Sequence, residues 1–225
     1  MSKTGVLLVV SGLSGAGKGT IVNRLLQKHP DDYVLSISAT TRKPREGETD
    51  GVDYFFVTKR RFRTAVKNGE LLEHAEFVGN FYGTPASYVE ELRNNGRNVI
   101  LEIEINGALQ VMEKCPDCLS IFILPPSMEE LEARIRGRNS ENEEVLQGRL
   151  EKARKEMSYV DRYKYHVVNH DIQQAADEIG AIINETSGQI TNLAEKSAAN
   201  MEEIERSTAS VATAETTFEE IFRNL

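Results

Sequence analysis

The sequence predicts an α/β protein in which a parallel β-sheet is covered by helices on both faces, with a small mixed lobe inserted and a helical lid. Three observations lead to this fold class. Short apolar runs alternate with amphipathic segments along the main fold, an order typical of parallel sheets. A glycine-rich turn follows the first of these runs. Residues 39–85 interrupt the alternation with glycine, proline and charged residues.

The elements of the main fold follow from local patterns. The β-branched run Val6–Val10 is typical of a fully buried parallel strand. Ser127 precedes Glu129 and Glu130, an arrangement that caps a helix N-terminus. Further strands are predicted at 33–38, 98–105, 119–124 and 165–169, and helices from about 19, over 87–95, from 106, after Ser127, around Arg149 and over 172–183.

The inserted lobe, residues 39–85, is predicted to be a small mixed unit. It begins with a surface loop that ends in a short strand near Phe56. Lys59–Asn68 has helical periodicity, and Gly69 follows as a C-cap. Two strands, 70–78 and 80–84, complete the lobe.

The core is therefore expected to comprise residues 1–38 and 86–186. Residues 187–225 differ in composition: they are rich in Ala, Ser, Thr and Glu and carry a rough helical stripe of apolar residues. We expect this tail to be a helical or partly disordered extension, with no role assigned to it.

Charge and hydropathy limit the possible partners. The net charge of −8 argues against a general nucleic-acid binder. No apolar run approaches the roughly 20 residues that span a bilayer. The N-terminus leads into the first strand without a signal peptide's cleavage site. We expect a cytoplasmic protein with no nucleic acid and no membrane partner; monomer and homo-oligomer both stay open.

The two cysteines form the short motif Cys115–Cys118. A redox pair and half of a zinc site are both conceivable, but a zinc site needs two more ligands and the four histidines are scattered. A turn that leads into the next strand is the preferred interpretation.

The glycine-rich turn has the parts of a phosphate cradle. Its glycines let backbone N–H groups point inward, the following helix end adds positive potential, and Lys18 reaches the terminal phosphates. The usual pattern places a hydroxyl residue after the lysine to ligate Mg²⁺, whereas this chain has Gly19 followed by Thr20. We therefore expect Mg²⁺ to be held by phosphate oxygens and water, without a direct protein ligand. The Gly-Lys-Gly-Thr variant resembles that of nucleoside monophosphate kinases.

Four side chains of the inserted lobe indicate a second phosphate site. Arg42 and Arg45 lie three residues apart in a loop that should face the cradle, and each guanidinium can hold a phosphate with paired hydrogen bonds. Tyr54 and Tyr82 offer hydroxyl groups nearby. Each alone could be an ordinary surface residue, but their joint placement favours a phosphate acceptor site.

Longer segments resemble guanylate kinase from about residue 5 to about residue 185, in unbroken order. They are 38–48, 51–54, 79–84, 101–108 and 134–138. The resemblance implies transfer of a phosphoryl group from ATP to GMP, and also to dGMP, giving GDP and ADP. It implies ATP-binding positions at Gly12, Ser14, Gly15, Ala16, Gly17, Lys18, Gly19, Thr20 and Asn169. It implies GMP-binding positions at Ser38, Arg42, Arg45, Tyr54, Glu73, Tyr82, Thr84 and Glu104.

The chemistry of guanine agrees with the place of Glu73 in this set. Guanine presents adjacent N1–H and N2–H₂ donors, which one carboxylate can accept together, whereas adenine has an acceptor at N1. Mismatched polar groups of this kind discriminate by about 10⁴-fold. Two positions depart from the family pattern: Glu104 stands where Asp is frequent, and Thr84 where Ser is also used. Both keep the functional group.

Three arginines resemble the lid arginines of the family: Arg134, Arg138 and Arg149. With Lys18 and Arg42 they form the predicted catalytic set, because phosphoryl transfer depends mainly on alignment and charge neutralisation. The lid is expected at about 137–149, and Arg136 is expected to belong to a charged helix face instead. Two alternatives stay open: a related kinase for another nucleotide or a sugar phosphate, and a non-catalytic guanylate-kinase-like binding module.

Overall fold

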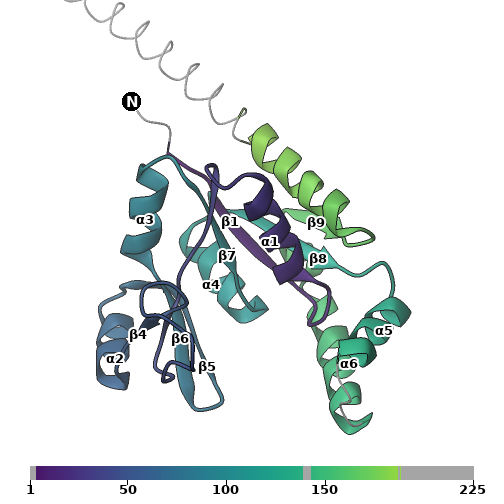
Figure 1. The fold of residues 1–225 in the computed structure, drawn as a ribbon, viewed down its shortest axis with the longest axis horizontal. Coiled ribbons are helices and arrows are strands. Elements are labelled where there is room, and N and C mark those ends of the chain that lie inside the picture. The colour runs from purple at the N-terminus through teal and green to yellow at the C-terminus, as the bar shows by residue number, and fades with distance from the viewer. Residues whose placement is uncertain (1–3, 139–142, 187, 189–225) are drawn as a thin grey trace, which may run out of the picture. The chain divides into compact units, whose positions relative to one another are not determined.

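The computed structural model describes residues 4–138, 143–186 and 188 (Figure 1). The chain divides into two units, residues 1–180 and 181–225. Most of the expected tail, and residues 139–142 of the expected lid, lie outside the described residues.

A five-stranded parallel sheet forms the centre of the first unit, in the order β2-β7-β1-β8-β9. The middle strand β1 is buried along its whole length, as its apolar run predicts. The strands are β1 (Leu7–Gly12), β2 (Tyr33–Leu35), β7 (Asn98–Glu102), β8 (Leu119–Leu124) and β9 (Tyr165–Val168).

Helices flank this sheet (Figure 1), so the fold class predicted from the sequence is confirmed. Ser127 Oγ accepts the N–H of Glu130 at 3.2 Å, the cap expected for α5. The helices are α1 (Lys18–Lys28), α3 (Ala86–Asn94), α4 (Ile105–Lys114), α5 (Met128–Arg138) and α6 (Glu143–Met157), with a 3₁₀ turn η1 (Val160–Arg162) and a last helix over 172–186.

Two strands are shorter than predicted. β2 ends at Leu35 rather than at residue 38, because the chain leaves the first sheet there and joins the second at Ala39. β7 ends at Glu102, and Ile105 opens α4 instead of closing the strand. The buried side chain of Ile105 packs from the helix, so tertiary contact overrides the β-propensity of this residue.

A second, four-stranded sheet follows the order β4-β3-β6-β5. It is mixed, because β3 pairs with β4 in parallel while the other pairs are antiparallel. Helix α2 begins after Thr58, whose side chain caps it, and Gly69 follows it at φ +69°. The elements are β3 (Ala39–Thr40), β4 (Phe55–Phe56), α2 (Lys59–Lys67), β5 (Leu71–Phe77) and β6 (Asn80–Pro85).

The two faces of the second sheet differ in polarity. Gly83 and Pro85 lie on the face covered by the buried ring of Phe62, where a Cβ at Gly83 would be 3.1 Å from that ring. Because successive side chains of a strand alternate, Tyr82 and Thr84 lie on the opposite face. That face is the polar one, and it positions most of the side chains discussed next.

Candidate active site

The carboxyl ends of the parallel strands bring the glycine loop and several polar groups to one edge of the first sheet. Gly12 ends β1 at φ +143°, and a Cβ there would lie 2.3 Å from the carbonyl oxygen of Ile123. Gly17 has φ +94°, and a Cβ there would lie 2.5 Å from Asn169 Nδ2. The loop can therefore take this path only with glycine at both positions.

Helix α1 begins at Lys18, and its N-cap residue, Gly17, supplies no side-chain acceptor, so among the described residues no cap covers the first N–H groups of the helix. Next to them is a cavity of about 360 Å³, lined by Gly15, Gly17, Lys18, Gly19, Thr20, Asn23 and Glu102. This is the place expected for the donor phosphates.

Lys18 is half-buried beneath the loop. Its Nζ donates to the carbonyl oxygens of Gly12 at 2.9 Å and of Leu13 at 3.2 Å. Burial lowers the pKa of Lys18, and the carboxylates of Glu156 and Glu102 act in the opposite direction. A buried ammonium with these neighbours is suited to receive an anion.

Asn169 follows β9 and supports the loop from the side. Its buried Nδ2 donates to the carbonyl oxygen of Ala16 at 2.8 Å. Arg134 of α5 donates from Nη2 to the carbonyl oxygen of Asn169 at 3.0 Å and from Nε to Glu130. Its Nη1 is buried and has no hydrogen-bond partner among the described residues. Arg134, Asn169, Gly15 and Thr20 share a cavity of about 250 Å³.

Arg42 is held within its own loop. Its two Nη atoms donate to the two carboxylate oxygens of Glu48, each at 2.8 Å. Glu48 also accepts the N–H of Arg45 at 2.7 Å, and the Arg42 guanidinium holds the pKa of Glu48 down to about 2. The Arg42 guanidinium carbon lies 5.3 Å from the ring centre of Tyr54, which contacts the ring of Tyr82 at 6.1 Å. Three of the four predicted phosphate-holding side chains thus form one cluster, while the side chain of Arg45 is exposed.

Glu73 is a buried carboxylate on the polar face of the second sheet. Thr84 Oγ1, from the neighbouring strand, donates to Glu73 Oε1 at 2.8 Å. A Cβ at Gly107 of α4 would lie 2.7 Å from Glu73 Oε2, so a side chain there would displace this carboxylate. Burial raises the pKa of Glu73, and the Thr84 hydroxyl and Lys114 act against that rise. Ser38 is half-buried, and its carbonyl accepts the N–H of Phe55.

Glu104 lies just before α4 and is largely exposed. Its Oε2 accepts a hydrogen bond from Lys152 Nζ of α6 at 2.8 Å. Lys152 also lies 3.6 Å from Glu156, whose other oxygen accepts the N–H of Ser14 at 3.1 Å.

Sequence reasoning missed three of these groups: Glu102, Lys152 and Glu156. The position of Glu102 could have revealed it, since it ends the strand beside β1 and pairs in register with Val10. No local pattern marks Lys152 or Glu156, because their partners are distant in the sequence.

The expected lid is described only in part. Arg149 lies on α6 and is half-buried. The side chain of Arg138 and residues 139–142 lie outside the described part of the chain. Arg136 forms ion pairs with Glu132 and Glu143, both at 2.9 Å, which confirms its place in a charged helix face.

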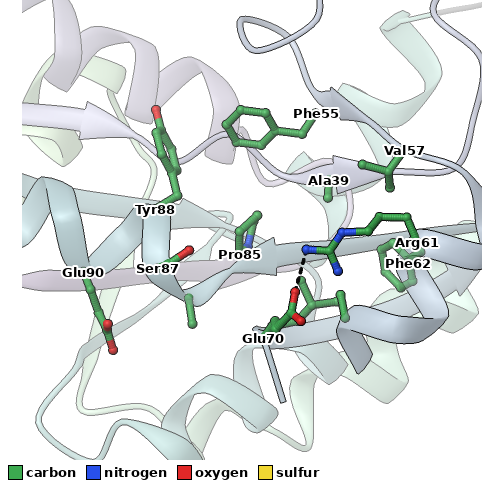
Figure 2. Close-up of a pocket in the computed structure, with 13 residues that line it drawn as sticks. Ala39, Phe55, Val57, Arg61, Phe62, Glu70, Pro85, Ser87, Tyr88 and Glu90 are labelled. Atoms are coloured by element: carbon green, nitrogen blue, oxygen red, sulfur yellow. Dashed lines mark hydrogen bonds and ion pairs between the residues drawn. The ribbon is translucent and has the colours of Figure 1, made fainter. Parts of the chain in front are cut away.

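A further, more apolar pocket lies away from these groups. Figure 2 shows it on the α2 face of the second sheet, with a volume of about 590 Å³. Phe55, Phe62 and Tyr88 supply its aromatic wall, and Arg61 pairs with Glu70 at its edge. None of its lining residues belongs to the glycine loop or the Arg42 cluster. We therefore do not assign chemistry to it.

The cysteines form the expected turn, in which the N–H of Cys118 donates to the carbonyl oxygen of Cys115 at 2.9 Å. Both thiols are free, and burial raises the pKa of Cys118 to about 11. Among the described residues, no group of three or more His, Cys, Asp or Glu side chains could hold a metal ion. No helix in the described part of the chain is long and apolar enough to cross a membrane.

Comparison with known proteins agrees with this geometry. A family model described as guanylate kinase matches residues 4–186. A guanylate kinase of Clostridium perfringens (strain 13 / Type A) is 56% identical over 179 residues, which are 80% of this chain and 82% of that protein. A guanylate kinase of Clostridioides difficile (strain 630) is 48% identical over 84% of this chain and 92% of its own. The crystal structure of guanylate kinase from Anaplasma phagocytophilum matches with a TM-score of 0.63 and 39% identity, covering 83% of this chain and 88% of that chain. The chain therefore belongs to the guanylate kinase family and is a nucleoside monophosphate kinase.

Proposed function

We propose that this enzyme transfers the γ-phosphoryl group of ATP to GMP, and to dGMP, giving ADP and GDP. A phosphate oxygen of GMP attacks the γ-phosphorus, and the bond from that phosphorus to the bridging oxygen of ADP breaks. The single observation that carries the choice of GMP is the buried Glu73 carboxylate, held by Thr84 on the same face as Tyr82.

The donor nucleotide would bind at the glycine loop. The uncapped N–H groups at the start of α1 would hold its phosphates, together with Gly15, Ala16, Gly17, Gly19 and Thr20. Lys18 would exchange the carbonyls of Gly12 and Leu13 for phosphate oxygens. Asn169 would act through the loop, because its amide is already bonded to Ala16.

The acceptor nucleotide would bind to the polar face of the second sheet. Glu73 would accept from N1–H and N2–H₂ of guanine, with Thr84 and Ser38 beside it. The phosphate of GMP would bind Arg42, Arg45, Tyr54 and Tyr82. Arg42 would keep Glu48 on one side and meet the phosphate with its remaining donors, since a guanidinium carries five N–H groups.

The lid would complete the site when both nucleotides are bound. Arg134, Arg138 and Arg149 would neutralise the charge that spreads over the transferring group, and closure would exclude water that could hydrolyse ATP. The unpartnered, buried Nη1 of Arg134 beside the glycine loop supports this role. One arginine in such a position contributes about 10³-fold or more in rate.

The residues at the loop fit a magnesium ion carried by ATP. Glu102 lines the same cavity as Lys18 and Thr20, so a carboxylate, a group that suits a hydrated Mg²⁺, lies beside the place proposed for the phosphates. Phosphate oxygens and water would ligate Mg²⁺, and Glu102 would hold the hydrated ion by accepting hydrogen bonds from its water. The ion would supply charge neutralisation at the β- and γ-phosphates.

We also propose the wider assignments: a core of 1–38 and 86–186, a GMP-binding lobe of 39–85, a lid near 137–149 and a tail over 187–225. The enzyme would act in the cytoplasm, in purine nucleotide metabolism.

A coupled assay of ADP formation with GMP, dGMP, AMP and UMP as acceptors tests the proposal. We expect turnover with GMP and dGMP, and at least about 10³-fold lower kcat/KM with AMP, because N1 of adenine offers a lone pair to Glu73. Turnover with AMP or UMP comparable to that with GMP would point to a related kinase. Absence of GMP-dependent ADP formation would point to a binding module.

A further inference from the structure

Near its C-terminal end, α6 carries a buried carboxylate that reaches the glycine loop. Only 11% of the Glu156 side chain is exposed, and charged side chains are almost never buried to this degree without a partner. Its Oε2 accepts the N–H of Ser14 at 3.1 Å, across 142 positions of sequence. A hydrogen bond to an ionised acceptor is about twice as strong as a neutral one. The loop is therefore tied to the C-terminal part of α6.

Lys152 connects this carboxylate to a second one. It lies one helical turn before Glu156, with Nζ 3.6 Å from Glu156 Oε1 and 2.8 Å from Glu104 Oε2. Burial lowers the pKa of Lys152, but Glu104 and Glu156 outweigh this and raise it above its usual value. Lys152 is thus a cation shared by two carboxylates, and a continuous chain of polar contacts runs from Ser14 to Glu104.

Lys18 lies within the electrostatic influence of this chain of contacts. Among the charges that oppose the effect of burial on Lys18, Glu156 is the strongest. Lys18 bonds to carbonyls of the same loop whose Ser14 amide Glu156 holds. One carboxylate therefore acts on both the position of the loop and the charge of its lysine.

We propose that Glu156 is a positioning residue for phosphoryl transfer, and that Lys152 couples it to Glu104 in the acceptor site. The proposal rests on the proposed function for the identity of the two nucleotides. Glu156 touches neither nucleotide in this scheme; it fixes the start of the glycine loop and the ammonium of Lys18. Because Lys152 also bonds to Glu104, the position of Glu104 at the GMP site affects the position of Glu156.

Removal of the negative charge of Glu156 is expected to lower kcat. Glu156→Gln keeps an oxygen for Ser14 but weakens that bond, so the loop and Lys18 are less well aligned with the transferring group. The lost negative charge also makes the site more attractive to ATP, which offsets the weaker fixation in the ground state. We expect kcat to fall about tenfold, because small misplacements of reacting groups reduce rates strongly. The KM for ATP should change by less than threefold.

The test compares Glu156→Gln, Lys152→Met and the double variant with matched controls. Glu151→Gln and Lys155→Met are the controls, because these residues form an exposed ion pair at 2.7 Å on the same helix with the same spacing. Rates are divided by the concentration of protein that binds a fluorescent ATP analogue, which separates misplacement from loss of folded enzyme. Wild-type turnover of GMP in the same assay tests the proposed function independently.

We expect Lys152→Met to lower kcat about threefold and the double variant to match Glu156→Gln within about twofold, because contacts in one network are not additive. The controls should behave as wild type. Unchanged kcat in Glu156→Gln, a loss that vanishes after division by binding-competent protein, or multiplicative effects in the double variant would overturn the proposal.

Discussion

The glycine loop and the loop around Arg42 are held in place by different kinds of contact. The glycine loop is backbone held by distant parts of the chain: Gly12 lies against Ile123, and Ala16 bonds to Asn169 across 153 positions. The Arg42 loop is held by side chains, with Arg42 and Glu48 only six residues apart.

This difference implies different behaviour on binding. The glycine loop cannot change shape without moving the core, so we expect the proposed donor site to be preformed. The Arg42 loop is closed by the ion pair between Arg42 and Glu48, so its shape depends on two side chains that can adjust when a phosphate binds the remaining donors of Arg42. Mutations in the two regions should therefore have different kinetic effects. Changes in the glycine loop should mainly lower kcat, and changes in the Arg42 loop should mainly weaken the binding of GMP.

Removal of the lysine from the glycine loop should have the largest effect. We expect Lys18→Ala to lower kcat by about 10³-fold, because it removes a preorganised cation from the transferring phosphates. The GMP affinity, measured by titration calorimetry without ATP, should stay within threefold of wild type. Near-normal turnover would contradict the donor-site assignment.

Arg42→Lys should have the next largest effect, confined to the acceptor. The variant keeps the charge and loses the planar fork, so the paired bonds to Glu48 and to phosphate cannot both form. We expect the KM for GMP to rise about 10²-fold while the KM for ATP stays constant. Equal increases for both nucleotides in steady-state kinetics would show that the two regions do not act separately.

Glu73→Gln tests recognition of the base within the acceptor site, separately from binding of the phosphate. We expect the KM for GMP to rise by about 30-fold, because a neutral amide cannot accept both guanine donors. In the wild type, burial raises the pKa of Glu73 above 4.5. GMP binding should therefore weaken as the pH falls towards 4.5, and the variant should lack this dependence. A KM for GMP that is equal in both proteins at pH 7.5 would remove Glu73 from base recognition.

The same substitution should stabilise the nucleotide-free enzyme. A carboxyl whose pKa is higher in the folded state than in the unfolded chain destabilises the fold when ionised, and the deficit disappears as the pH falls below both values. The Tm of Glu73→Gln should therefore exceed that of wild type at pH 7.5, and the difference should close as the pH approaches 4.5. A lower Tm at pH 7.5 would contradict the burial of an ionised group at this site.

Glu48→Gln should give the smallest effect. Its carboxylate holds Arg42 and the N–H of Arg45, so the amide would leave the loop less ordered but the guanidinium intact. We expect a three- to tenfold higher KM for GMP with unchanged kcat. A lower KM would show that Glu48 competes with GMP for Arg42 instead of orienting it.

The sequence predicted those parts of the molecule whose signals are local. The apolar run of β1, the glycines and Lys18 lie within 15 residues, and their structure follows from backbone sterics. The role of the polar side chains around Glu73 was predicted from the resemblance to a family, because no periodicity in the sequence marks them. The register of β5 and β6 then shows why Glu73 meets Thr84.

The remaining features depend on contacts that no local pattern encodes. Ile105 belongs to a helix because its buried side chain packs there, although the apolar run that precedes it favours a strand. Glu156 meets Ser14 only because the C-terminal part of α6 lies beside the glycine loop, 142 positions away in sequence. Arg42 and Glu48 are close in sequence, but their pairing depends on the path of a loop that has no regular structure.

The central claim is that the glycine loop and the Arg42 loop bind phosphates on opposite sides of one gap. A ligand in which adenosine and guanosine are joined through five phosphates tests it most directly. We predict that it binds the wild type at least 10²-fold more tightly than ATP or GMP alone, because both ends engage at once. Lys18→Ala and Arg42→Lys should each abolish that gain. An affinity equal to that of ATP alone would show that the two sites do not meet, and would contradict the account.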